Sequence, residues 1–165
     1  MKLSKEQQQS AVDKLSTPWG RATLRCDGYL VTLDVRRISK ASMSYRVFVY
    51  VNGTMNSAWC YEKNAAPEAK FLRKSVRPNV SPVKRKEVEK ALGKRRMAKD
   101  PYWSGSMTLY LPDFANGKAA ISHLCKVCES VELLDDDAAR EALAAIAAPA
   151  GAAEADATAG AALEA

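Results

Sequence analysis

Residues 21–34, RATLRCDGYLVTLD, encode a complete β-hairpin and so decide the fold class of this chain. Apolar and polar residues alternate on both sides of Asp27-Gly28, a dipeptide that favours a two-residue hairpin turn. With this turn one face of the ribbon is apolar, pairing Cys26 with Tyr29, Leu24 with Val31 and Ala22 with Leu33. The other face is mostly polar. The stretch therefore predicts two antiparallel strands with one buried face.

Patterns on either side of the hairpin predict further strands and helices. A third strand over residues 43–51 ends at Asn52-Gly53, again a hairpin dipeptide, and a shorter fourth strand ends near Cys60. Capping and turn residues divide the rest of the chain. Helices are expected over residues 4–15, 68–76, 82–92 and 116–127, and strands over 104–111 and 130–134. We predict an α+β fold, an antiparallel sheet of about four to six strands built from hairpins and packed by two or three helices.

Composition divides the chain into one domain and a tail. Residues 1–134 hold almost all the large apolar side chains, enough for one domain. Residues 135–165 are acidic and rich in alanine, with Pro149, Gly151 and Gly160 as interruptions. Alanine favours helix but buries little area, so we expect transient helix over residues 137–148 and disorder beyond it.

The start of the chain and its apolar segments bear on its location. Residues 1–10, MKLSKEQQQS, lack the apolar run of a secretory signal, and no stretch reaches the roughly 20 apolar residues of a membrane helix. We therefore expect a cytoplasmic protein without a membrane partner. Its four cysteines are then expected to be reduced rather than paired in disulfides.

Charge is distributed very unevenly along the chain. Residues 1–128 carry twenty-four basic and ten acidic side chains, a net charge of +14, whereas residues 129–165 carry a net charge of −8. A body this basic indicates a polyanionic partner. The acidic tail could also compete for the basic surface as an internal polyanion.

The densest positive charge lies between Arg73 and Lys99, where only Glu87 and Glu89 are acidic. Here we expect a basic helix over residues 82–92, with the basic run 94–96 continuing into a loop. Such a segment could follow a phosphate backbone, although a solvated helix face is the alternative interpretation. The candidate nucleic-acid-binding cations are Arg73, Lys74, Arg77, Lys84, Arg85, Lys86, Lys90, Lys94, Arg95, Arg96 and Lys99.

Aromatic residues near this segment could add base stacking, as in proteins that bind single strands. Tyr102 and Trp103 follow the basic run directly and complete the candidate site. Phe48, Tyr50 and Trp59 are weaker candidates, because large aromatic residues on strands usually belong to the core.

The cysteines and the single histidine raise the question of a metal site. His123, Cys125 and Cys128 lie within six residues, and Cys26 or Cys60 could supply a fourth zinc ligand. The same residues continue an apolar helical face through Ala120, Ile121 and Leu124, and no second Cys-x-x-Cys or Cys-x-x-His pair is present. We therefore interpret them as core residues and predict neither a metal nor a cofactor.

No pattern indicates catalysis. His123 is the only histidine, the body acids are scattered, and no glycine-rich nucleotide-binding loop occurs. We predict that the chain is not an enzyme.

Three segments carry a resemblance to a known group of proteins. TPWGRATLRCDGYLVTLDV (17–35), EAKFLRKSVRP (68–78) and GKAAISHLCKVCESVEL (117–133) resemble small uncharacterised proteins of tailed bacteriophages and prophages. The resemblance spans residues 15–134 and implies a role in host takeover in a bacterial cytoplasm.

Together these observations predict a non-enzymatic accessory protein that binds DNA or RNA with little sequence specificity, single-stranded or duplex. Two alternatives stay open. One is a protein-binding module that blocks an acidic or nucleic-acid-binding host complex, such as a ribonucleoprotein. The other is a virion or assembly component.

Overall fold

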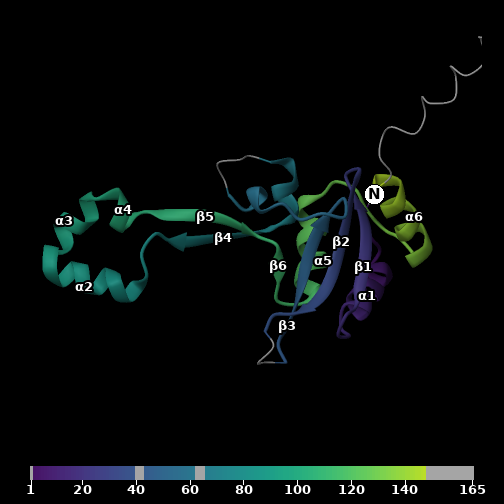
Figure 1. Cartoon of the computed structure of the whole chain (residues 1–165), viewed down its shortest axis with the longest axis horizontal. Helices are drawn as coiled ribbons and strands as arrows, with labels where there is room; N and C mark the ends of the chain where they lie inside the picture. Colours follow the sequence, from purple (N-terminus) through teal and green to yellow (C-terminus); the bar gives the residue numbers. More distant parts are fainter. Residues whose placement is uncertain (1, 40–42, 62–65, 148–165) are drawn as a thin grey trace, which may run out of the picture.

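The computed structural model describes residues 2–39, 43–61 and 66–147. It has the expected α+β class, but its strands form two separate sheets. Figure 1 shows a body around a curved sheet and, projecting from it, a two-stranded ribbon with helices at its far end.

A five-stranded antiparallel sheet, in the order β6-β3-β2-β1-β7, forms the centre of the body. Its strands are β1 (Arg21–Cys26), β2 (Tyr29–Arg37), β3 (Tyr45–Val51), β6 (Asp113–Phe114) and β7 (Val131–Leu133). The register predicted for the first hairpin is confirmed at all six pairs, from Arg21↔Asp34 to Cys26↔Tyr29. Asp27 and Gly28 have φ values of 49° and 85°, as a two-residue primed turn requires.

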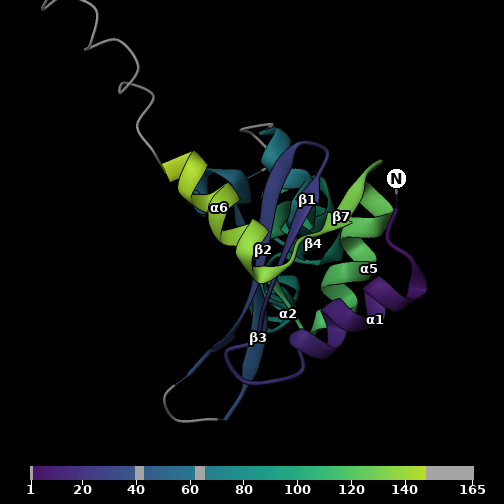
Figure 2. The same cartoon turned by 90° about the vertical axis from the view of Figure 1, so that its right-hand side faces the viewer.

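Two helices, α1 (Lys5–Lys14) and α5 (Gly117–Val127), cover one face of this sheet (Figure 2). Ala11 and Leu15 of the first helical segment pack with Ile121 and Leu124 of α5 and with the buried strand residues in one core. The helices approach closely where Gly117 opens α5, since a Cβ atom there would lie 2.7 Å from the Cβ atom of Leu15.

A third helix, α6 (Asp136–Ala147), lies on the opposite face of the sheet (Figure 2). Its Ala139 is buried with Leu30 and Leu134, and Leu143 packs beside them. Residues 136–147 belong to the predicted tail, and here they form a packed helix. Residues 148–165, for which disorder was predicted, lie outside the described residues. Among the residues described, no helix is long and apolar enough to cross a membrane.

Residues 73–111 form the projecting element, hereafter the arm (Figure 1). Strands β4 (Arg73–Pro78) and β5 (Ser106–Leu111) pair antiparallel from Arg73↔Leu111 to Pro78↔Ser106. Between them lie the tip helices α2 (Pro82–Leu92), α3 (Lys94–Lys99) and α4 (Pro101–Ser104). No residue of the arm belongs to the buried core of the body.

Three local predictions are wrong. In place of a helix over 68–76, a short 3-10 helix η3 (Pro67–Phe71) leads into β4. In place of a fourth strand ending near Cys60, the chain forms the 3-10 helix η1 (Ser57–Cys60), because Asn56 caps it through a 2.9 Å bond from the Ala58 N–H. Residues 94–96 lie in α3 rather than in a loop.

Candidate nucleic-acid interface

The helix α2, predicted from its caps, forms as expected. Ser81 is the N-cap, and its hydroxyl accepts a 3.4 Å hydrogen bond from the Lys84 N–H. Pro82 is the first helical residue, and Gly93 ends the helix with a φ of 80°. No residue of α2 is buried. The helix therefore presents nearly its whole circumference to solvent.

The two shorter helices fold the tip back on itself. Gly93, which ends α2, directly precedes α3, and Asp100 caps α4 by accepting a 2.9 Å bond from the Tyr102 N–H. Val80 and Met97 are the buried apolar residues of the tip. Such a small local core holds the tip helices in place while leaving the cations exposed.

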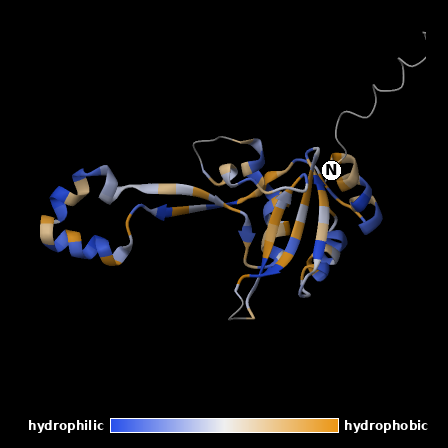
Figure 3. Cartoon of the chain, in the orientation of Figure 1, coloured by the Kyte–Doolittle hydropathy of each residue, from blue (hydrophilic) through white to orange (hydrophobic). Residues whose placement is uncertain are grey.

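Ten of the eleven predicted cations are exposed on the arm. They are Lys74, Arg77, Lys84, Arg85, Lys86, Lys90, Lys94, Arg95, Arg96 and Lys99. The side chains of these ten residues form no ion pair and no hydrogen bond with any residue in the described part of the chain. Figure 3 shows hydrophilic colour along much of α2 and α3, with apolar residues between, whereas the central strands of the body are mostly apolar.

The eleventh cation, Arg73, holds the base of the arm instead. Its Nε donates to the Asp113 carbonyl oxygen at 3.0 Å, and its guanidinium lies 3.6 Å from the Asp113 carboxylate. Arg46 of β3 pairs with the same carboxylate. Leu72, which directly precedes the arm, and Phe114, which follows it, are both buried. The base of the arm is thus fixed to the central sheet.

The two aromatic candidates at the tip differ in accessibility. Tyr102 and Trp103 pack edge to face with their ring centroids 5.1 Å apart. Tyr102 is 61% exposed, whereas Trp103 is half-buried. Of the weaker candidates, Trp59 packs against the core, and Phe48 and Tyr50 are half-buried on β3. Tyr102 is therefore the ring in the arm best placed to stack on a partner.

Sequence reasoning did not anticipate the exposed apolar side chains of the arm. Val76, Val83, Leu92 and Met107 are all exposed and lie among the cations. Their signal was present in the sequence, since β-branched and long apolar residues recur through the basic segment. These side chains stay exposed because they lie on the arm, away from the buried core of the body.

The histidine and cysteine cluster serves packing. The Nε2 atom of His123 lies 3.0 Å from the Lys70 carbonyl oxygen, to which it donates, and burial lowers the pKa of this imidazole. Cys26 and Cys128 are buried free thiols. The hydrogen bond that the Cys26 thiol donates to Cys128, together with burial, raises the pKa of Cys26. Within the described ranges, no three histidine, cysteine or acidic side chains gather as a metal site requires.

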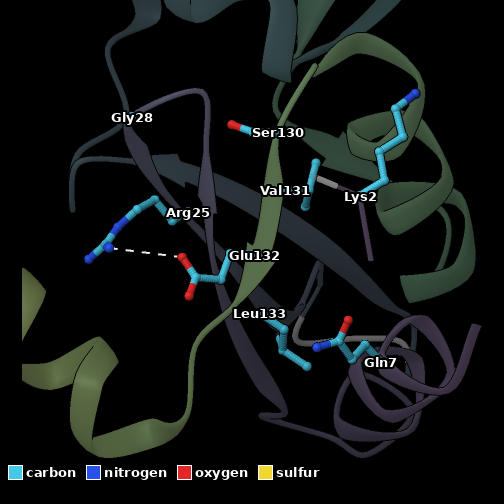
Figure 4. Close-up of a pocket in the computed structure, with 8 residues that line it drawn as sticks. All are labelled: Lys2, Gln7, Arg25, Gly28, Ser130, Val131, Glu132 and Leu133. Carbon is cyan, nitrogen blue, oxygen red and sulfur yellow. Dashed lines mark ion pairs between the residues drawn. The ribbon is translucent and has the colours of Figure 1, made fainter. Parts of the chain in front are cut away.

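A depression of about 370 Å³ lies beside the edge strand β7 (Figure 4). Lys2 and Gln7 line one side of it, and Val131 projects from the strand on that side. Arg25 and Glu132 lie on the other side, 3.9 Å apart. Because these opposite charges offset each other, this depression lacks the strong positive field of the arm.

Comparisons with protein-family models, curated proteins and solved structures found no match to this chain. The resemblance to phage proteins therefore stays a prediction, and the case for function depends on the arm itself.

Proposed function

We propose that this protein is a non-enzymatic nucleic-acid-binding protein whose arm contacts the phosphate backbone with little sequence preference. The observation that carries the proposal is the set of ten exposed, unpaired cations on an element that supplies no residue of the buried core of the body. Repulsion among these charges opposes folding, and a bound polyanion would neutralise them. The release of condensed counterions from the polyanion would favour binding further. The resemblance to phage proteins supports a site of action in the cytoplasm of a bacterial host.

A titration across a salt series tests this proposal. Binding of the full chain to a fluorescent DNA duplex should weaken as salt rises, with a log-log slope of roughly −0.9 for each phosphate contacted. Replacing Lys84, Arg85 and Lys86 by glutamine should reduce the size of that slope by about 2 to 3. The matched control replaces Lys5, Lys118 and Lys126, which are also exposed but lie on α1 and α5.

The control should change the slope much less than the arm substitutions. Absence of binding at about 50 mM salt would refute the proposal. Equal slopes for the two triple variants would refute the assignment to the arm.

The exposed apolar residues of the arm favour a second candidate function, binding to a protein. Val83 is 68% exposed beside Lys84, and Tyr102 is 61% exposed near Lys99. Mixed apolar and cationic surfaces suit an acidic protein partner, such as a host complex that the chain would block. Substituting Val83 by serine separates the two, because it should leave the salt slope for DNA unchanged and weaken contact with a protein.

A further inference from the structure

The turn that precedes β1 holds a tryptophan in an unfavourable conformation. The Gly20 N–H donates to the Thr17 carbonyl oxygen at 3.0 Å, which closes a four-residue turn with Trp19 at its third position. Trp19 has a φ of 67°, in the left-handed region that disfavours bulky side chains. Glycine or asparagine is the usual residue at such a position.

The Trp19 side chain gains little packing that could offset the strain of its backbone. The Trp19 side chain is 69% exposed, and its described ring contact is an edge-on one with Tyr45 at 6.4 Å. Only glycine fits at position 20, because a Cβ atom there would lie 2.0 Å from the Lys14 carbonyl oxygen. The order Trp19-Gly20 therefore cannot be reversed. The turn therefore presents an indole to solvent at a cost of roughly 1–3 kcal/mol. Strain of this kind clusters at functional sites.

The indole borders a groove between the turn, β1 and α6. The groove has a volume of about 460 Å³, within the range of sites that bind small molecules. Ala139 and Leu143 of α6 supply its aliphatic lining. It therefore combines an aromatic ring and an aliphatic wall, which suits a flat ring as ligand.

Two arginines and one aspartate line the groove, so its charged lining has a net charge of +1. Arg21 and Arg140 line it, and both guanidinium groups are largely exposed. The Arg21 guanidinium shares the Asp34 carboxylate with Arg36, at 3.4 Å and 2.9 Å respectively, so one carboxylate faces two cations. The acid that lines the groove, Asp136, is paired with Lys14 at 2.9 Å, and Arg140 lies 3.6 Å from Asp137 at the exposed surface.

From this combination we propose that the groove beside Trp19 binds an unpaired nucleotide of a single-stranded nucleic acid. Its base stacks on the indole, and its phosphate lies near Arg21 and Arg140. The inference depends on the proposed nucleic-acid binding and extends it, because a stacked base must be free of its complementary strand. The groove lies at β1, and the arm leaves the sheet beyond β3 and β6, so the two sites are separate (Figure 1).

Replacement of Trp19 by glycine gives a clean test, since it removes the ring and supplies the residue that the turn prefers. The variant should fold at least as stably as the wild type. Its affinity for a twenty-nucleotide oligo(dT) should fall about tenfold, the effect of one base stacking on an aromatic ring, while duplex affinity stays unchanged. Trp19→Tyr should restore most of the loss.

A second measurement follows the indole directly. In a Trp59→Phe, Trp103→Phe protein the remaining fluorescence comes from Trp19, and oligo(dT) should quench it more strongly than a duplex does. Equal oligo(dT) affinities for wild type and Trp19→Gly would overturn the inference. Equal losses of affinity for oligo(dT) and duplex on this substitution would overturn it too. In either case the arm substitutions would still test the arm. Failure of the wild type to bind either probe would instead overturn the proposed function, and this inference with it.

Discussion

Asp27 connects three separate parts of the body through one carboxylate. Its Oδ1 atom accepts hydrogen bonds from the Glu129 and Ser130 N–H groups at 3.0 Å and 2.8 Å, next to β7. Its Oδ2 atom accepts from Lys70 of η3 at 2.7 Å. The hydrogen bond from Lys70 and those from the backbone lower the pKa of Asp27 to about 2. The residue first interpreted as half of a turn thus also joins the hairpin to η3 and β7.

Substitution of Asp27 by asparagine should lower the free energy of unfolding at pH 7 by about 1 kcal/mol, because hydrogen bonds to a charged acceptor are stronger than those to a neutral one. Asparagine tolerates the left-handed conformation, so the turn itself is retained. A carboxyl with a depressed folded pKa stabilises the fold above its unfolded pKa and loses that effect as pH falls toward the folded value. Urea unfolding of both proteins should therefore show their difference shrinking between about pH 5 and pH 2. A difference independent of pH would contradict this role of the charge.

The tip of the arm, between Arg77 and Met107, contributes nothing to the core of the body, whereas Tyr110 at the base packs against that core. Its base is held by Arg73, Asp113 and the buried Leu72, whereas Val80 and Met97 are buried only within the tip. Because the ribbon pairs Arg77 with Met107, a two-residue turn can close it at this point with the correct register.

A protein in which Asn-Gly replaces residues 78–106 should therefore fold normally. Its free energy of unfolding should stay within about 1 kcal/mol of the wild type, since no core residue of the body is removed and the closed loop is shorter. Urea unfolding measures the stability, and the duplex titration should show that binding is lost. Collapse of the body on removal of the tip would show that the two parts fold as one unit.

Local signals made part of this architecture predictable. The hairpin of residues 21–34 and the ends of α2 follow from nearby residues alone, namely Asp27-Gly28, Ser81 and Gly93. β4 could not be found in this way, because its partner β5 lies beyond the whole tip and a helix was equally compatible with its own residues. The basic residues of the site were identifiable from charge, but their position on a projecting arm depends on that distant pairing.

At the scale of the whole molecule, positive and negative charge lie on different elements. The arm is basic, whereas Asp135 directly precedes α6 and Asp136 and Asp137 begin it, and α6 lies near the opposite edge of the sheet (Figure 1). The helix is also part of the packed body through Leu134 and Ala139. A test of the acidic tail as an internal polyanion must therefore leave α6 in place.

Truncation after Ala147 meets this requirement, because it removes the three acids Glu154, Asp156 and Glu164 and keeps the helix. If the tail competes with nucleic acid for the arm, the truncated protein should bind duplex DNA roughly threefold more tightly at about 50 mM salt, and the gain should fade as salt screens the charges. Replacing the same acids by glutamine in the full-length chain is the matched control, since it changes the charge and keeps the length. This variant should reproduce the gain. Unchanged affinity in both proteins would exclude competition by the tail, and a gain only on truncation would assign the effect to chain length rather than charge.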